Sequence, residues 1–196
     1  MANIQAPYGF RHIGFLGGYA PNFANASKLV SASNGTAIYA GDPVTQLNTG
    51  YIAKSTAGTT QIHGIFIGCE YFSTSRGYTW RSPYWPGSDA TGDVTAWVIH
   101  HPEALFQVQA GGAATAIALS NVGNNANFGA GTGNTATGQS GAYLDQTTVN
   151  TTSTLPFRII GLVTDPPGFN GTDTTTGYND VVVAFNWQDF KSTTGI

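Results

Sequence analysis

The chain has 196 residues, a formal net charge of −3 at pH 7, only 9% charged residues and 26 glycines. This length favours one domain whose hydrophobic core needs neither disulfides nor metals, and the scattered basic residues argue against a nucleic-acid partner. The single cysteine, Cys69, excludes a disulfide framework and a multi-cysteine metal site. No apolar run is long enough to span a membrane, and the first residues lack the pattern of a signal peptide.

Residues 1–35 are predicted to form an extended arm, because glycines and prolines interrupt any regular element there. The arm is too rich in aromatic residues for a disordered tail, so these side chains need a surface to bury against. Two alternatives stay open: the arm wraps its own domain, or it straps onto a neighbouring subunit. The aromatic side chains concerned are Tyr8, Phe10, Phe15, Tyr19 and Phe23.

Short strands are predicted for residues 36–40 and on both sides of the turn at residues 48–50, whose sequence Asn-Thr-Gly can reach positive φ. Residues 62–69 follow as a nearly continuous apolar run. Such a run is typical of a strand covered on both faces, so this strand is expected at the middle of the fold.

An aromatic and irregular region comes next, with a hairpin tip predicted at residues 76–77. Prolines prevent residues 82–86 from pairing as a central strand. Tyr84 and Trp85 are therefore expected to cap a barrel end or to present a contact surface.

The second half of the chain continues the strand pattern around a loop excursion at about residues 111–141. The Ala-rich stretch 113–119 is the candidate for a helix of one or two turns. Residues 121–141 are almost pure Gly, Asn, Ala, Thr and Ser, which fits either a flexible linker or a long ordered excursion. Further strands are predicted at residues 94–100, 104–110, 142–145, 155–164 and 180–187.

These elements predict an all-β fold: an antiparallel β-barrel or sandwich with long Gly/Asn/Thr-rich loops, an extended N-terminal arm and at most one short helix. Residues 36–196 are expected to form a single domain that follows the arm.

The sequence shows no pattern of catalytic residues, so we expect no enzymatic activity and no cofactor. His100 and His101 with Glu103 are the best metal candidate, but adjacent residues on a strand point to opposite faces. His12 and His63 are isolated in the sequence. Most aspartates lie at turns, where Asp accepts hydrogen bonds from nearby backbone N–H groups.

Several blocks, taken in their order, resemble a known family. The blocks are APYGFRHIG, AIYAGDPV, IHGIFIGCEY, SPYWPG, ALFQVQA, NVGNNANFGAGTGNTATGQSGAYLD and LPFRIIGLVTDPPG. Their order is similar to that of head decoration, or capsid cement, proteins of tailed bacteriophages. The resemblance implies a virion protein on the outer capsid surface, assembled in the host cytoplasm. It also implies two partners: the major capsid protein, and neighbouring copies of the chain itself in a homotrimer or a dimer.

Aromatic side chains are expected to anchor the contact with the capsid. The candidate anchors are Tyr8, Phe10, Phe15, Tyr19, Phe23, Tyr84 and Trp85. Two other functions stay open as alternatives. One is a carbohydrate-binding β-sandwich adhesin, in which Trp80, Tyr84 and Trp85 stack on sugar rings, and the other is a minor head or tail structural protein.

Overall fold

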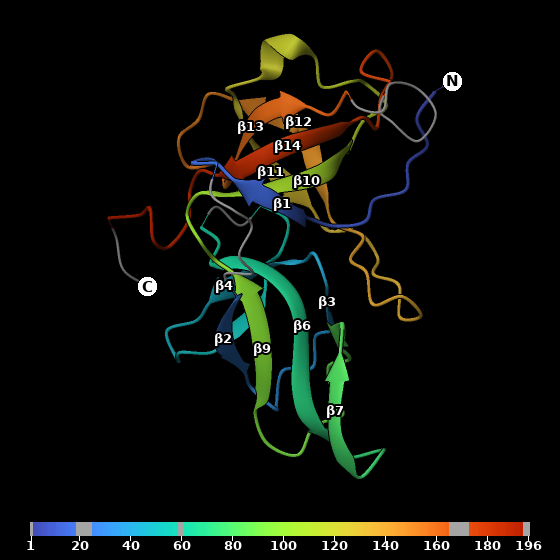
Figure 1. Cartoon of the computed structure of the whole chain (residues 1–196), viewed down its shortest axis with the longest axis vertical. Helices are drawn as coiled ribbons and strands as arrows, with labels where there is room; N and C mark the ends of the chain where they lie inside the picture. Colours follow the sequence, from blue (N-terminus) through green and yellow to red (C-terminus); the bar gives the residue numbers. More distant parts are fainter. Residues whose placement is uncertain (1, 19–24, 59–60, 165–172, 194–196) are drawn as a thin grey trace.

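The computed structural model describes residues 2–18, 25–58, 61–164 and 173–193, and nearly all of its regular structure is β-strand (Figure 1). The predicted all-β class with at most one short helix is confirmed. The helical structure in the described ranges is a single 3-10 turn, Leu119–Asn121. No helix in this part of the chain is long and apolar enough to cross a bilayer.

A small barrel forms the upper half of the molecule in Figure 1. Its sheet has the order β1-β10-β12-β11-β13-β14, and a further pairing between β10 and β14 closes five of these strands into a ring. β1 lies outside the ring and pairs antiparallel with β10. The strands are β1 (Arg11–Phe15), β10 (Ala104–Gly111), β11 (Asn125–Gly129), β12 (Tyr143–Asn150), β13 (Phe157–Leu162) and β14 (Asp180–Phe185).

A second sheet forms the lower half, with the order β2-β9-β6-β4-β5 and with β7 paired to the far part of β6 (Figure 1). A two-residue pairing joins β3 to β8. The predicted turn at residues 48–50 is confirmed between β4 and β5, and the predicted hairpin tip at residues 76–77 lies between β6 and β7. The strands are β2 (Asn25–Val30), β3 (Ile38–Tyr39), β4 (Pro43–Gln46), β5 (Ile52–Lys54), β6 (Gly64–Ser73), β7 (Tyr78–Ser82), β8 (Tyr84–Trp85) and β9 (Val94–Ile99).

Strand β6 connects two hydrophobic clusters, as expected for the apolar run at residues 62–69. Ile65 packs in the barrel cluster, whereas Phe66 packs in the cluster of the second sheet. An irregularity in the pairing with β9, between Phe66 and Gly68, then changes the alternation. A bulge of this kind shifts the side-chain period by one residue, so that Cys69 and Tyr71 face the same cluster as Phe66.

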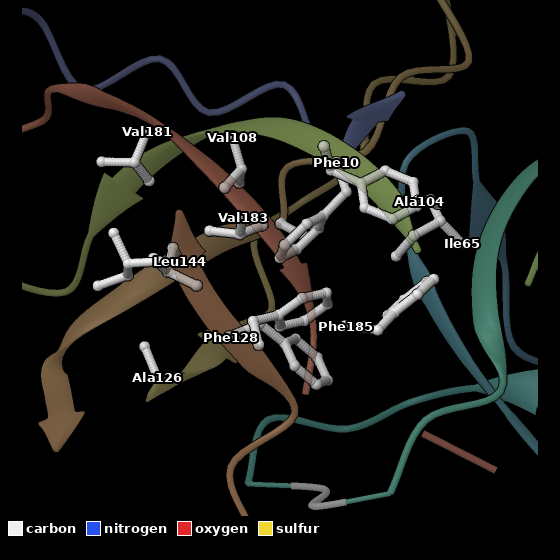
Figure 2. Packing of buried hydrophobic residues seen from close by; sticks show 14 of the residues in the cluster. Phe10, Ile65, Ala104, Val108, Ala126, Phe128, Leu144, Val181, Val183 and Phe185 are labelled. Atoms are coloured by element: carbon white, nitrogen blue, oxygen red, sulfur yellow. The ribbon is translucent and has the colours of Figure 1, made fainter. Parts of the chain in front are cut away.

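The barrel cluster collects side chains from both ends of the chain (Figure 2). Phe10, which precedes β1, and Ile65 of β6 lie at the end of the cluster near Ala104. Val181 of β14 and Leu144 of β12 lie at the other end. Phe10 therefore fills the end of the barrel that lies beside β6.

The first 35 residues differ from the expected irregular arm, because two strands form there. β1 pairs with β10, and β2 pairs with β9 along its whole length. Gly14, one of the glycines that suggested irregular structure, lies at the register shift of β1. A glycine in a strand often marks a bulge of this kind, and the pairing partners lie far away in sequence, where local turn signals give no information about them.

The helical turns predicted at residues 113–119 do not form, apart from the start of the 3-10 turn. The backbone of Ile117 instead bonds to a buried side chain: its N–H donates to Asn179 Oδ1 at 2.9 Å, and its carbonyl accepts from Asn179 Nδ2 at 3.0 Å. Asn side chains compete with helical hydrogen bonds in this way. The wrong prediction rested on alanine content alone.

The excursion at about residues 111–141 is ordered, and the linker alternative is wrong for its middle part. Residues 125–129 form β11, and all five of them are buried. The sequence NANFG has low β propensity, but its polar side chains are satisfied. Asn125 donates to the Thr152 carbonyl at 3.0 Å and accepts from Arg158 Nε at 3.0 Å.

Candidate functional site

Three of the predicted contact residues are buried inside their own chain. Phe10 and Phe15 are 3% and 7% exposed, and Trp85 is fully buried. The Trp85 ring packs edge-on against Tyr71, and its Nε1 donates to the Asn34 carbonyl at 3.1 Å. For these three residues, the alternative of packing within their own subunit holds.

The other predicted contact residues have different positions. Tyr8 and Tyr84 are half-buried. The Tyr84 ring stacks on Tyr39, with 5.3 Å between centroids and 8° between planes, so one of its faces is covered. Tyr19 and Phe23 lie outside the described residues.

The N-terminal segment, defined here as residues 2–18, is fixed on the barrel by hydrogen bonds at several points. The Ala6 N–H donates to Gln109 Oε1 at 2.8 Å, and Gln109 Nε2 donates to the Ile4 carbonyl at 3.1 Å. Phe10 stacks on Phe157 of β13, with 4.3 Å between ring centroids. The inward face of the segment therefore belongs to the hydrophobic core.

The outward face of this segment carries aliphatic side chains. Ile13 and Leu16 are 44% and 48% exposed, and they flank the buried Phe15. The Leu16 N–H donates to the Glu103 carbonyl at 2.9 Å, which holds the backbone in place. Both residues were missed because only aromatic side chains were considered as anchors. Simple alternation would also place Ile13 on the same face as Phe15, and it is the register shift between His12 and Gly14 that separates the two.

A hollow of about 570 Å³ opens beside the segment, and we call it the polar hollow. Tyr8, His12 and Asp180 line it. The Tyr8 hydroxyl and Asp180 Oδ1 are buried and lie near each other, yet no hydrogen bond of normal geometry joins them. Burial raises the pKa of Tyr8 and of Asp180, and it lowers the pKa of His12. All three shifts favour the uncharged form of these side chains. The Arg11 guanidinium and the Gln107 amide also line the hollow.

A second hollow of about 340 Å³ lies beside the β6–β7 hairpin, and we call it the hairpin cleft. Trp80 of β7 and Tyr84 of β8 contribute aromatic rings to its wall. Arg76 at the hairpin tip and Asp89 contribute charged groups. Sequence analysis placed Trp80 and Tyr84 in one aromatic region, but it did not identify Arg76 or Asp89 as their neighbours.

The histidines do not gather into a metal site. His63 Nδ1 lies 2.7 Å from Asp189 Oδ2, and its ring packs against His100 with 5.4 Å between centroids. His101 faces different surroundings, where its Nδ1 accepts from the Glu103 N–H at 3.2 Å. Among the described residues, no group of three or more His, Cys, Asp or Glu side chains could hold a metal ion.

The lone cysteine is a core residue. Cys69 is fully buried, and burial raises its pKa to about 12. The thiolate is the reactive form of cysteine, so this thiol is not a nucleophile near neutral pH.

Comparisons of the chain with protein-family models, with curated proteins and with solved structures found no match. The function proposed below therefore rests on the surfaces of the chain and on the order of its sequence blocks.

Proposed function

We propose that this chain is a structural protein of a tailed-bacteriophage virion that coats the outer surface of the capsid. It binds the lattice of the major capsid protein and stabilises the head by bridging neighbouring capsomers. The observation that carries this proposal is the outward aliphatic pair, Ile13 and Leu16, on a segment that is anchored in its own core by Phe10 and Phe15. The choice of the major capsid protein as the partner comes from the resemblance of the sequence blocks to decoration proteins.

The anchoring of the segment favours binding because it reduces the loss of conformational freedom on association. A flexible strap would have to become ordered at each contact, at about 0.5–1.5 kcal/mol for each immobilised side chain. Here the backbone around Ile13 already pairs with β10. A preorganised aliphatic pair on a weakly charged surface matches the core of a protein interface, where charged residues are depleted.

Repetition on a lattice adds to the effect of each contact. An interface of standard size buries roughly 1,600 Å² in total. When one subunit, or a symmetric trimer or dimer of it, contacts several capsomers, the second contact forms at high effective concentration. Many modest contacts can then hold a shell together without any strongly charged patch.

Co-sedimentation with capsids that lack this protein tests the proposal. The double variant Ile13→Ser/Leu16→Ser should lose at least tenfold in affinity for the capsid, because it removes the apolar contact and leaves the inward face of the segment intact. Leu119→Ser is the matched control, since Leu119 is also exposed, at 76%, but lies on the 3-10 turn. Equal binding by the wild type and the double variant would contradict the proposal.

Deleting the segment is a poorer test. Removal of residues 1–24 would take Phe10 and Phe15 out of the barrel cluster, so lost binding would not be separable from lost folding. Copy number per virion separates the decoration role from the alternative of a minor head or tail protein. A decoration protein is present in amounts comparable to the capsid protein, and a minor component is not.

A further inference from the structure

The hairpin cleft is a built hollow between parts of the chain that are far apart in sequence. One wall is the β6–β7 hairpin, another is the β8 segment, and a third is the loop around Thr135 and Gly138. Its volume of about 340 Å³ falls within the range of small-molecule sites. Nothing in the proposed attachment to a capsid uses this cleft, and neither Ile13 nor Leu16 lines it.

Tyr84 offers a rigid aromatic platform at the cleft. One face of its ring stacks on Tyr39, and the ammonium of Lys54 lies 5.5 Å from the Tyr39 ring centroid. This stack fixes the orientation of Tyr84 while leaving the residue half-exposed. The electron-rich face of an aromatic ring attracts the polarised C–H groups of a ligand that packs on it.

Arg76 and Asp89 supply polar groups beside the aromatic rings. The Arg76 guanidinium lies over the Trp80 ring, with Cζ 4.4 Å from the ring centroid. Its Nη1 is 3.8 Å from Asp89 Oδ2, which is longer than the roughly 2.7–3.2 Å of a hydrogen bond. Among the described residues no hydrogen bond occupies this guanidinium, so its N–H groups remain available to a ligand.

Asp89 is held in a fixed, ionised state. Its Oδ2 accepts from Ser73 Oγ at 2.6 Å, and its Oδ1 accepts from the Ser75 N–H at 2.9 Å. The Ser73 hydrogen bond, followed by that of Ser75, lowers the pKa of this carboxyl. Each carboxylate oxygen has two lone-pair sites, so Asp89 can still accept from a ligand.

The third wall is preorganised as well. Asn134 Oδ1 accepts from the backbone N–H of Ala136 at 2.9 Å and of Thr137 at 3.3 Å, which fixes the loop. Gly138 lets this loop approach the β8 segment, because a Cβ at that position would meet Pro83 Cγ at 2.3 Å. The cleft therefore exists without a ligand and does not need to be assembled by one.

We propose that the hairpin cleft binds a carbohydrate. A sugar ring has an apolar C–H face, which suits Tyr84, and a hydroxyl rim whose groups both donate and accept. A single hydroxyl can accept from Arg76 and donate to Asp89 across the 3.8 Å gap, whereas neither the Pro side chains nor the backbone of a proline-rich peptide offers such a group. This site is independent of the proposed binding to a capsid.

The test uses the full-length chain on an array of defined glycans, followed by titration of the best-bound soluble oligosaccharide with tryptophan fluorescence as the readout. We expect a subset of glycans to be retained. Arg76→Gln and Tyr84→Ala should each lower the affinity at least tenfold, and Trp80→Phe should abolish most of the fluorescence change. Arg81→Gln is the matched control, because Arg81 is an exposed arginine on the same hairpin that pairs with Glu70 and does not line the cleft.

Several results would overturn the site. These are retention of no glycan by the wild type, equal loss of affinity in Arg76→Gln and Arg81→Gln, or a fluorescence response to a polyproline peptide in place of sugars. Arg76 has 43% of its side chain exposed, so its replacement leaves the core intact and keeps the comparison interpretable. Capsid co-sedimentation of Arg76→Gln should match the wild type, which separates failure of this site from failure of the proposed function.

Discussion

Phe10 of the N-terminal segment stacks on Phe157 inside the barrel, whereas Tyr84 of β8 stacks on Tyr39 at the edge of the hairpin cleft. Both residues come from aromatic stretches with frequent Gly or Pro, for which the sequence predicts little regular structure. Their sequences favour the same interpretation for both, a contact surface. The structure separates them: one completes a core, and the other lines a hollow.

The difference arises from the side chains that lie next to each stretch in the folded chain. The closed barrel leaves apolar side chains uncovered at the end near Ala104 and Ile65, and Phe10 covers them (Figure 2). Tyr84 of β8 instead lies at the wall of the hairpin cleft, where Tyr39 stacks on one face of its ring and the residue stays half-exposed. The density of aromatic residues therefore indicates buried area or binding area, and the surrounding topology decides between the two.

The largest effect on the free energy of unfolding is expected at Phe10, and it tests whether the N-terminal segment is part of the core. Phe10→Ala should lower the free energy of unfolding by about 3–5 kcal/mol, because it deletes a buried ring and leaves a cavity. Phe72→Ala is the control, since Phe72 is 47% exposed on the hairpin and should change stability by no more than about 0.5 kcal/mol. Urea unfolding followed by circular dichroism gives both values. Similar small losses in the two variants would mean that the segment is only an attached arm.

Sequence reasoning identified most of the fold because strong strands carry their own signals. The apolar run that became β6, the turn before β5 and the hairpin tip after Ser73 all depend on local residue types. β1 and β11 depend on distant partners, and their sequences RHIGF and NANFG contain glycine and asparagine but only one β-branched residue, Ile13. Strands of this kind are stabilised by pairing and burial, which a single sequence does not show.

A second test concerns Asp42, whose side chain contacts both the loop between β11 and β12 and strand β5 of the second sheet. This buried carboxylate accepts from Ser140 Oγ at 2.5 Å and pairs with Lys54 at 2.8 Å, and the Lys54 ammonium in turn lies over the ring of Tyr39. Asp42→Ala should cost about 3 kcal/mol in the free energy of unfolding, because it leaves a mostly buried ammonium without its partner. Asp93→Ala is the control.

Asp93 also bonds to a side chain, since it accepts from the Tyr51 hydroxyl at 2.8 Å, but both groups are exposed. Its removal should cost less than about 1 kcal/mol. Equal costs for Asp42 and Asp93 in urea unfolding at pH 7 would show that the buried Asp42–Lys54 pair does not hold the loop around Ser140 to the second sheet.

A third test separates close packing at the cleft from backbone conformation. Gly138 and Gly77 have nearly the same backbone angle, with φ of +72° and +75°, but a Cβ at Gly77 would meet open space. Gly77→Ala should cost about 1 kcal/mol from left-handed strain alone. Gly138→Ala should cost about 2 kcal/mol or more, because the clash with Pro83 adds to the same strain. Thermal unfolding measures both, and equal costs would mean that the loop does not press against β8.

The candidate sites were only partly accessible to sequence reasoning. Trp80 and Tyr84 are near each other in the chain, so the aromatic part of the cleft follows from composition. Thr135 joins them through the path of a loop that comes from the barrel, and no local pattern predicts that path. The same holds for the polar hollow, in which Tyr8 and Asp180 come from opposite ends of the chain.

The smallest expected effect concerns that polar hollow, where the N-terminal segment buries a carboxyl group as well as its rings. Burial raises the pKa of Asp180, and the groups around it are the Tyr8 hydroxyl, the Gln107 amide, the Arg11 guanidinium and the His12 ring. A raised folded-state pKa stabilises the fold below the unfolded pKa of the carboxyl, and this contribution is lost as the pH rises through the folded pKa. Asp180→Asn should therefore be more stable than the wild type at pH 7, and the difference should shrink toward pH 4.

Asp173→Asn is the control of opposite sign. Hydrogen bonds from Thr175 lower the pKa of Asp173, so its contribution is present above the ordinary pKa of the carboxyl and is lost as the pH falls through the folded value. That variant should be slightly less stable than the wild type at pH 7, and the difference should also shrink on acidification. Unfolding curves at pH 4 and pH 7 give the two signs. If Asp180→Asn were destabilising at pH 7, the carboxylate would have to be well solvated there, and the N-terminal segment would cover the barrel less closely beside Tyr8 than it does at Phe10.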